Sequence, residues 1–148
     1  MAGSLNALLE QVLDFFEADA KHRNVEIVRY LDGDLPIIKM DKQTLQAALQ
    51  NMVKNSMEAM SDGGQLVVRT RMMRSGVAVD LIDTGQGIGS STLIKMFEPF
   101  YTTKDSGSGL GLPMAKKVIE AHGGVINVQS EEGRGTQFTI EFPIPKRL

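Results

Sequence analysis

The sequence predicts an α+β fold, a two-layer α/β sandwich in which one mixed, mostly antiparallel sheet carries helices on one face. Residues 5–20 and 42–60 each place apolar side chains at helical spacing. Two pairs of short alternating segments indicate β-hairpins, namely 65–72 with 76–83 and 125–130 with 136–142. Helices and hairpins therefore come in blocks, which is typical of an α+β domain.

The bulk properties are those of one globular domain over residues 1–148. The chain has 148 residues, of which 42% are hydrophobic and 23% charged, and this is enough to bury one core. A net charge of −2 gives no electrostatic reason to expect nucleic acid or a membrane surface as a partner. The absence of cysteine excludes disulfides and thiolate metal sites and fits the cytoplasm, and no apolar run is long enough to span a bilayer. Residues 1–4 have the composition of an expression remnant, and no role is expected for them.

Short elements precede the second long helix. The first helix is expected to be capped by Ser4 or Asn6, whose side chains can accept a hydrogen bond from its first turn. A strand is predicted at 25–31, where β-branched residues are frequent, and a turn separates it from a second short strand at 37–40.

The helix predicted over 42–60 gives the first chemical signal. Asp41 is placed to cap it. Its apolar residues share one broad face, whereas Asn51, Asn55 and Glu58 lie at i, i+4 and i+7 on the opposite face. Asparagine is a poor helix former, so two of them one turn apart indicate a functional face, with a solvated polar face as the alternative. The amide oxygen of asparagine is a hard, neutral ligand that suits Mg²⁺.

The stretch from Asp83 to Leu112 organises the rest of the chain. An alternating apolar run ends in Asp83, and two glycine clusters follow, Gly85, Gly87 and Gly89 and then Gly107, Gly109 and Gly111. Glycine lets the backbone approach a ligand closely, and the N–H groups at the start of a helix bind anions. An acid followed by two glycine clusters, the second opening a helix, indicates a nucleotide whose base is recognised and whose phosphates are cradled.

Two common nucleotide motifs are absent. No G-x-x-x-x-G-K-[ST] sequence occurs, which excludes a P-loop protein. The first glycine cluster has the spacing G-x-G-x-G, and no βαβ unit surrounds it, so a dinucleotide fold is not expected.

A short helix, a loop and a third long helix are expected around the second glycine cluster. The short helix is capped by Ser90 or Ser91 and ends near Met96. Residues 102–108 lack apolar periodicity, which predicts a mobile loop. The long helix begins within the second glycine cluster, carries a proline in its first turn and ends at His122.

Five motifs in this order resemble the ATP site of sensor histidine kinases, within the wider superfamily of gyrase, heat-shock chaperone, histidine kinase and mismatch-repair ATPases. They are Asn51-Met-Val-Lys-Asn55, Asp83-x-Gly85-x-Gly87, Phe97-Glu-Pro-Phe100, Gly107-x-Gly109-Leu-Gly111-Leu112 and Gly133-x-Gly135-Thr136-x-Phe138. Each motif is weak alone, but the five together cover nearly the whole chain. Two further segments, Asn55–Met60 and Phe100–Lys104, look most like the nitrogen-regulatory type of kinase. The fold that the resemblance implies is the Bergerat-type ATP-binding fold.

The resemblance implies how the base of ATP would be bound. Asp83 would accept a hydrogen bond from the 6-amino group of adenine, and Thr136 would support the base through water. A carboxylate repels the carbonyl oxygen that guanine has at this position, so Asp83 would select adenine. Gly85 and Gly87 would let the backbone pass close to the base, with Ile88 beside them.

The resemblance also implies how the phosphates would be bound. Asn55 would hold Mg²⁺, Asn51 would assist at the phosphates, and Lys104 or Lys54 would be the cation for the γ-phosphate; Asn51, Asn55 and Lys104 are the predicted catalytic residues. A solvated loop lysine is the alternative reading of Lys104. A lid over about 89–108 and the start of the next helix would supply the remaining contacts, which are Phe97, Phe100, Thr103, Gly107, Ser108, Gly109, Leu110, Gly111 and Leu112.

The histidine that receives the phosphoryl group is expected on another domain. Sensor kinases phosphorylate a histidine with an acidic neighbour on a helical dimerisation domain, and a response regulator acts downstream. His22 precedes Arg23 and His122 precedes Gly123, so neither matches. His122 is expected at a helix C-terminus, where a cation is favoured. The resemblance therefore implies a cytoplasmic catalytic domain, whether or not the parent protein is membrane-anchored. Its expected partners are the phosphoacceptor domain and a response regulator. No nucleic acid and no direct membrane contact are expected.

Three classes of function stay open. The first is the catalytic domain of a histidine kinase, the second an ATPase that uses ATP as a conformational clamp, and the third a module that binds nucleotide without transfer. The ATPase relatives carry a glutamate one turn before the magnesium asparagine to activate water, and Asn51 occupies that position here. Stand-alone serine kinases acting on regulatory proteins also often carry that glutamate, and their similar size keeps them as the main alternative.

Overall fold

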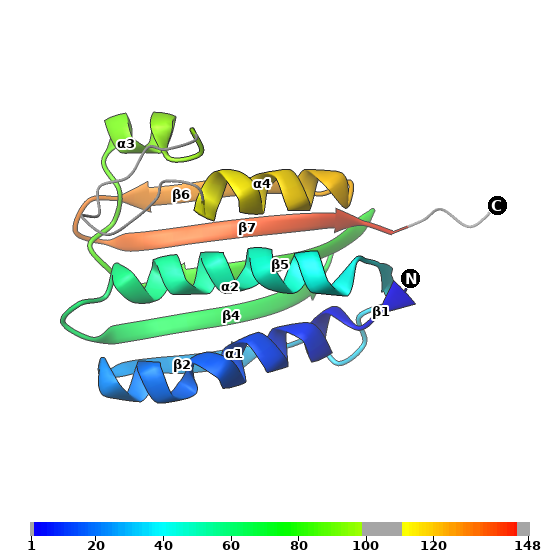
Figure 1. The fold of residues 1–148 in the computed structure, drawn as a ribbon, viewed down its shortest axis with the longest axis horizontal. Coiled ribbons are helices and arrows are strands. Elements are labelled where there is room, and N and C mark those ends of the chain that lie inside the picture. The colour runs from blue at the N-terminus through cyan, green and yellow to red at the C-terminus, as the bar shows by residue number, and fades with distance from the viewer. Residues whose placement is uncertain (1, 99–110, 145–148) are drawn as a thin grey trace.

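The computed structural model describes residues 2–98 and 111–144, which form a sheet covered on one face by helices (Figure 1). The helices are α1 (Leu5–His22), α2 (Lys42–Glu58), α3 (Ser90–Lys95) and α4 (Gly111–Ala121). The strands are β1 (Ala2–Gly3), β2 (Val25–Tyr30), β3 (Ile38–Lys39), β4 (Gly64–Met72), β5 (Gly76–Asp83), β6 (Val125–Glu131) and β7 (Gly135–Pro143).

Five strands form one mixed sheet in the order β2-β4-β5-β7-β6. β2 and β4 pair in parallel, whereas β4 with β5, β5 with β7 and β7 with β6 pair antiparallel. In Figure 1, α1, α2 and α4 cover the same face of this sheet, and α3 stands beyond one end of α4. The predicted α+β sandwich, with a mixed, mostly antiparallel sheet and helices on one face, is therefore confirmed.

The core lies between the helices and the sheet. β5 is the central strand and is buried along nearly its whole length. Fully buried apolar side chains come from both layers, among them Leu8, Leu9, Leu49, Val53, Leu66, Val79, Leu81 and Ile140. Because burying one such side chain contributes roughly 1.5–3 kcal/mol, this contact fixes α1 and α2 on the sheet. Within the part of the chain that the structure describes, no helix is long and apolar enough to cross a membrane.

The N-terminal residues belong to the fold. Ala2 and Gly3 form β1 and pair antiparallel with β3, a contact that the sequence did not predict because a two-residue strand has no periodicity. Ser4 is the N-cap of α1, and its hydroxyl accepts the N–H of Ala7 at 3.2 Å, as predicted. Residues 2–4 therefore contribute a strand and a helix cap, whatever their origin.

Two helices end at different residues than predicted, and in each case the backbone turns out of the helix at the observed end. α1 continues to His22 rather than ending at residue 20, and the chain then turns at Asn24, whose φ is 60°. α2 ends at Glu58 rather than at residue 60, and the carbonyl of the next residue, Ala59, accepts a hydrogen bond from the N–H of Gln86. Such contacts come from distant segments, so periodicity alone does not place these ends.

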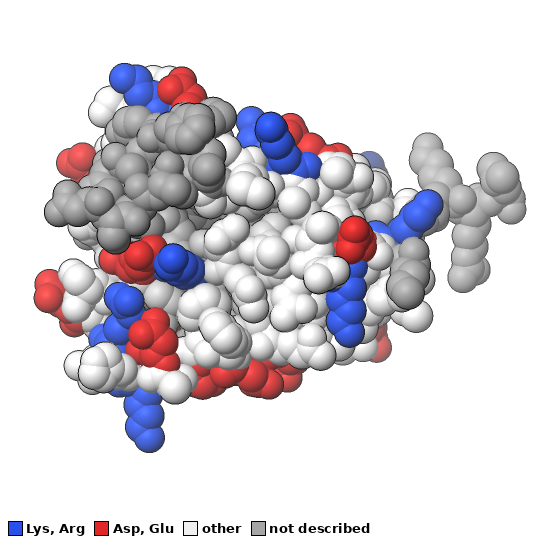
Figure 2. Space-filling view, viewed as in Figure 1, with Lys and Arg blue, Asp and Glu red and all other residues white. Residues whose placement is uncertain are grey.

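Arg29 ties α1 to the edge strand β2. Its guanidinium lies 3.1 Å from Glu10, 3.0 Å from Asp14 and 2.8 Å from Glu17, three acids at helical spacing on α1. Burial lowers the pKa of Arg29, but the hydrogen bonds to these acids raise it by more, so the side chain stays a cation. Figure 2 shows acidic side chains along the lower edge of the molecule, where α1 and β2 lie in Figure 1. A helix thereby covers an otherwise open sheet edge.

His122 ties the end of α4 to the start of α2. Its Nδ1 lies 2.8 Å from the carbonyl oxygen of Val118, and its Nε2 lies 2.9 Å from the backbone N of Asp41. A backbone N–H can only donate, so Nε2 accepts and the proton is on Nδ1. His122 therefore lies directly after α4, as predicted, and links the end of this helix to Asp41 before α2. Asp41 does stand at the N-cap position of α2, but its side chain makes no capping hydrogen bond.

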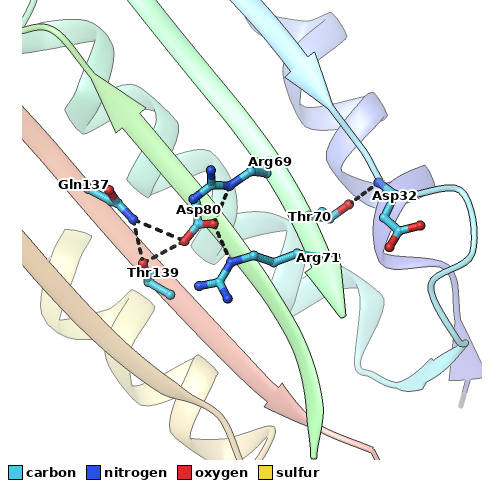
Figure 3. A network of polar contacts seen from close by, with 7 residues as sticks. All are labelled: Asp32, Arg69, Thr70, Arg71, Asp80, Gln137 and Thr139. Carbon is cyan, nitrogen blue, oxygen red and sulfur yellow. Dashed lines mark hydrogen bonds and ion pairs between the residues drawn. The ribbon is translucent and has the colours of Figure 1, made fainter. Parts of the chain in front are cut away.

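A second polar tie lies on the face of the sheet away from the core, at Asp80 of β5 (Figure 3). The Asp80 side chain is fully buried and accepts hydrogen bonds from Arg69 and Arg71 of β4, each at 2.9 Å, and from Thr139 of β7 at 2.8 Å. Burial raises the pKa of Asp80, but the hydrogen bonds from Arg71, Thr139 and Arg69 lower it by more, so it lies below its ordinary value. The carboxylate of Asp80 therefore links three neighbouring strands, β4, β5 and β7.

We expect Asp80→Asn to lower the free energy of unfolding by about 1–3 kcal/mol, because the bonds from both arginines lose their charged acceptor. Ionised Asp80 stabilises the fold above the pKa of an unfolded aspartate, and this contribution is lost as the pH falls through the lowered pKa of the folded state. The difference between the two chains should therefore shrink in acid. Urea unfolding at several pH values measures this difference in unfolding free energy, and Asp62→Asn in an exposed turn is the control. Equal stabilities of wild type and Asp80→Asn at neutral pH would show that Asp80 does not stabilise the sheet.

Candidate functional site

The candidate site lies at the end of the sheet where β5 ends and β7 begins. The strand register places Leu66, Asp83, Thr136 and Ser130 opposite one another in β4, β5, β7 and β6. We call Asp83, Thr136 and Ser130 the polar row. The preceding core-facing residue of β5, Leu81, is apolar and fully buried. The core face of the sheet therefore changes from apolar to polar at this end, as a site for a ligand with a polar edge requires.

Asp83 is a carboxylate with 3% of its surface exposed. Its Oδ1 accepts the backbone N–H of Gly85 at 2.9 Å. Burial raises the pKa of Asp83, and hydrogen bonding to Gly85, Ser56 and Thr136 offsets this only in part, so its pKa lies above the ordinary value. Unlike Asp80, this acid has no arginine beside it in the described structure. A buried acid kept without a counter-charge is typical of a functional group and offers an acceptor to a donor on a ligand.

Ser56 of α2 lies next to this carboxylate and was not singled out from the sequence. Its side chain is buried and lowers the pKa of Asp83, yet its hydroxyl makes no hydrogen bond of standard geometry with any described group. The unusual occurrence of asparagine in a helix singled out Asn55. It gave no reason to single out Ser56, which belongs to the apolar face of α2 and was interpreted as a core residue.

Ser130 of β6 is a second residue that the sequence analysis missed. Its hydroxyl accepts the N–H of Ile88 at 2.7 Å, donates to the carbonyl of Gly135 at 2.9 Å and lies 2.8 Å from the hydroxyl of Thr136. A serine near the end of a strand has no distinguishing pattern in the sequence. Only the register of β6 against β7 shows that it belongs to the polar row.

The segment 84–89, which follows Asp83, is held between the end of α2 and the turn 131–135. The N–H of Gln86 donates to the carbonyl of Ala59 at 3.1 Å, and the N–H of Gly133 donates to the carbonyl of Gln86 at 2.7 Å. One residue, Gln86, therefore links the end of the helix that carries the asparagines to the hairpin that carries Thr136.

Gly85 and Gly87 are required by this packing. A Cβ at Gly85 would lie 2.6 Å from the carbonyl oxygen of Ala59, and a Cβ at Gly87 would overlap the carbonyl oxygen of Glu131. Gly87 also has a φ of 74°, which L-residues with side chains rarely adopt. The close approach that these glycines permit is thus to the protein itself, and their contact with a base stays a prediction.

The predicted phosphate end brings α2 against the start of α4. The side-chain Oδ1 of Asn51 lies 3.8 Å from the position that a Cβ of Gly111 would take. Asn55, one turn later, is half-buried, and Lys54 is exposed. The first turn of α4 contains no acidic residue, so its N–H groups can attract an anion. Leu112, in the same turn, packs against the core.

The side chains present fit Mg²⁺ bound together with phosphates. Mg²⁺ usually takes one or two oxygen ligands from the protein and completes its shell with water and phosphate oxygens. Among residues 2–98 and 111–144, no group of three or more His, Cys, Asp or Glu is placed to hold a metal. The amide oxygen of Asn55 therefore suits a metal that arrives with a nucleotide.

α3 lies in the first part of the predicted lid, and the chain is anchored to the core just after it. Met96 is buried, Phe97 packs against the core, and the Lys116 ammonium lies 5.4 Å from the centre of the Phe97 ring. The predicted cap by Ser90 or Ser91 is wrong, because Gly89 occupies the N-cap position and Ser90 is already helical. The predicted mobile loop and the predicted contacts Phe100, Thr103, Lys104, Gly107, Ser108, Gly109 and Leu110 lie outside the described residues.

A groove of about 950 Å³ opens elsewhere, between the start of α2 and the end of α4. Its lining includes Lys39, Lys42 and Lys117 around Met40 and Val118, and it contains no member of the polar row. We place the site at the polar row because it holds a buried carboxylate that has no cationic partner among the described residues, whereas no buried charged group lines the groove.

The fold and the polar row together define a nucleotide-binding domain. Residues 40–146 match the family of histidine kinase-, DNA gyrase B-, and HSP90-like ATPases, and the chain belongs to this family. The motifs that suggested such a family from the sequence are therefore correctly read, although the likeness to the nitrogen-regulatory type stays a prediction.

Individual relatives are sensor kinases. Sporulation kinase E of Bacillus subtilis (strain 168) is 38% identical over 138 residues, which are 93% of this chain and 19% of that protein. The signal transduction histidine-protein kinase AtoS of Escherichia coli (strain K12) is 38% identical over 142 residues, 95% of this chain and 23% of that protein. The solved catalytic domain of histidine kinase ThkA, in a nucleotide-free form, matches with a TM-score of 0.87 and 31% identity, over 97% of this chain and 94% of that chain. The chain thus spans about a fifth of these two curated relatives.

We expect Gly87→Ala to destabilise the chain more than Gly133→Ala, by about 1–3 kcal/mol. Both glycines have positive φ, 74° and 82°, so both substitutions carry the same backbone strain. No atom lies within 4 Å of a Cβ at Gly133, whereas a Cβ at Gly87 would overlap the Glu131 carbonyl. Thermal unfolding of the two variants measures the difference, and equal losses would show that contact with the turn does not require glycine at Gly87.

Proposed function

We propose that this chain is the catalytic ATP-binding domain of a sensor histidine kinase, which transfers the γ-phosphoryl group of ATP to a histidine on a separate helical dimerisation domain. The observation that carries the proposal is the buried carboxylate of Asp83 beside Thr136, which has no counter-charge among the described residues. The match to the catalytic domain of ThkA, over nearly the whole of both chains, supports it.

The base is bound at the polar row. Asp83 accepts a hydrogen bond from the exocyclic 6-amino group of adenine, and its buried setting makes that bond stronger than it would be in water. Guanine presents a carbonyl oxygen at the same position, which the carboxylate repels. Thr136, opposite Asp83 in the register, supports the base through water.

The phosphates are bound where α2 meets α4. The N–H groups at the start of α4 and the amide of Asn51 contact phosphate oxygens, and Asn55 is a ligand for Mg²⁺. The metal supplies positive charge between the phosphates during transfer. Lys104 in the lid, or the exposed Lys54, is the cation for the γ-phosphate.

Asn51 favours phosphoryl transfer over hydrolysis. A hydrolase needs a base beside the phosphates to orient water and take its proton. The Asn51 side chain faces Gly111 at the start of α4, which is the position such a base would need. An amide can hydrogen-bond but cannot take a proton at neutral pH. The chain therefore keeps its ATP until a histidine arrives as the nucleophile.

Two further solved structures support the proposed ligand and partner. Full-length ShkA in complex with AMPPNP matches this chain with a TM-score of 0.87 at 28% identity. Histidine kinase ThkA in complex with the response regulator TrrA matches with a TM-score of 0.83 at 28% identity. We accordingly propose that the parent protein acts in the cytoplasm, where ATP is available, and passes its phosphoryl group to a response regulator.

We expect Asp83→Asn to weaken ATP binding about 10- to 150-fold, the value of a hydrogen bond to a charged group. The same change should stabilise the empty chain at neutral pH. The raised pKa of Asp83 means that the protonated form favours folding, and this stability is present in acid and lost as the pH rises through the folded pKa. Asparagine never carries the charge, so its advantage should vanish in acid. Calorimetry with ATP and GTP and thermal unfolding measure both effects, and unchanged ATP affinity would remove Asp83 from the base site.

A transfer assay tests the kinase function itself. The chain is incubated with γ-labelled ATP, Mg²⁺ and separately prepared helical domains from candidate kinases, and acid-labile phosphohistidine is measured. We expect labelling of a helical domain, no labelling of the chain and very slow phosphate release by the chain alone. Asn55→Ala should abolish transfer because it removes the metal ligand, whereas Asn127→Ala, on an exposed position of β6, should leave transfer unchanged.

The opposite outcome favours the ATPase reading. Phosphate release at several turnovers per minute by the isolated chain, lost on Asn51→Ala, would show that Asn51 serves water activation and that the chain is a hydrolase. ATP binding with neither transfer nor release in any combination would favour a module that only binds nucleotide.

A further inference from the structure

Ser130 joins three segments of the proposed base site through a single hydroxyl. The Ile88 N–H lies 2.7 Å from its Oγ, the Gly135 carbonyl 2.9 Å and the Thr136 hydroxyl 2.8 Å. Ile88 belongs to the segment after Asp83, while Gly135 and Thr136 open β7. Ser130 therefore stands where the predicted walls of the base site meet.

The direction of each hydrogen bond follows from counting protons. A serine hydroxyl has one proton to donate and two lone pairs that accept. The carbonyl of Gly135 can only accept, so the proton of Ser130 is directed to it. The lone pairs of Ser130 then accept the N–H of Ile88 and the hydroxyl proton of Thr136. The hydrogen-bonding capacity of Ser130 is thereby filled, and the proton of Thr136 is fixed.

The position of this proton determines whether the Thr136 hydroxyl can donate a hydrogen bond to a ligand or accept one from it. With its proton given to Ser130, the Thr136 hydroxyl presents only lone pairs in other directions. Asp83, its neighbour across the β5–β7 ladder, is also an acceptor. Two acceptors side by side match an amino group, which donates, and oppose a carbonyl oxygen, which accepts.

We propose that Ser130 is a positioning residue for base selection, which fixes the Thr136 hydroxyl as an acceptor and so strengthens the preference for a 6-aminopurine nucleotide over a 6-oxopurine nucleotide. The contact between Thr136 and the base is direct or passes through one water. A water that donates one proton to Thr136 and the other to Asp83 has only lone pairs left, so it also accepts from a 6-amino group. The inference rests on the proposed ATP site and adds a selectivity element outside its predicted residues.

A purely structural role for Ser130 predicts a different result. Its bond to Ile88 also holds the segment after Asp83 in place, so loss of the hydroxyl lowers stability in either case. Loosening that segment would weaken all purine nucleotides alike. Release of the Thr136 proton would instead let this hydroxyl donate to a 6-oxo group, which changes the ratio of the two affinities.

The test is a double-mutant cycle on that ratio. Dissociation constants for ATP and GTP are measured by calorimetry on the wild-type chain, Ser130→Ala, Thr136→Val and the double variant, with thermal unfolding of each. We expect Ser130→Ala to reduce the preference for ATP over GTP about 3- to 10-fold in the wild-type background, and to leave it unchanged when Thr136→Val is already present. Ser130→Thr keeps the hydroxyl and should retain the wild-type preference. Ser130→Cys, whose sulfur accepts hydrogen bonds weakly, is the second variant should Ser130→Ala not fold.

Each outcome bears on one claim. An unchanged ATP to GTP ratio in a folded Ser130→Ala or Ser130→Cys chain overturns the role of Ser130 while leaving the ATP site intact. An equal loss of preference with and without Thr136→Val overturns the route through Thr136. Failure of the wild-type chain to prefer ATP would instead remove the proposed adenine site, and this inference with it.

Discussion

The burial of the Asp83 carboxylate is the constraint on which the rest of the site depends. Asp80 and Asp83 lie on the same strand and face opposite sides of the sheet, and both are almost fully buried. Two arginines and a threonine stabilise the charge of Asp80, so its pKa falls. Burial raises the pKa of Asp83, whose partners in the described part of the chain are neutral. The first acid therefore adds to stability and the second reduces it. The apolar core under α1 and α2 supplies the stability that allows an uncompensated acid to remain at the end of β5.

The position of Asp83 relative to the asparagines of α2 is set by backbone contacts. The bond between Gln86 and the Ala59 carbonyl joins the segment after Asp83 to the end of α2, and the bond between Gly133 and Gln86 joins the same segment to the β6–β7 hairpin. Glycine is required at Gly87 because no side chain fits between these layers. Elements distant in the sequence thus meet at one residue, Gln86, and a displacement there would move the proposed base end and phosphate end together.

The sequence predicted the parts of this arrangement that depend on local pattern. Helical spacing located α1 and α2, alternation located both hairpins, and the acid at the end of β5 was identified before its burial was known. The parts that depend on contacts between segments were not predictable. The place of Ser130 in the polar row follows from strand register, His122 forms a hydrogen bond with a residue 81 positions away, and β1 is too short to show a period. Asn55 was found because asparagine is unusual in a helix, whereas Ser56 beside it looks like an ordinary core residue.

The two ends of the helical layer differ in how completely their polar groups are paired. At one end His122 uses both ring nitrogens to join α4 to the start of α2. At the other end, among the described groups, the Ser56 hydroxyl has no partner of standard geometry and the Asp83 carboxyl has no cation beside it. A nucleotide that donates to Asp83 and places anionic groups at the start of α4 adds the interactions that folding leaves unmade. Because such a ligand would bind the folded chain and not the unfolded one, its binding would add to the stability of the domain at the end of the layer where the proposed site lies.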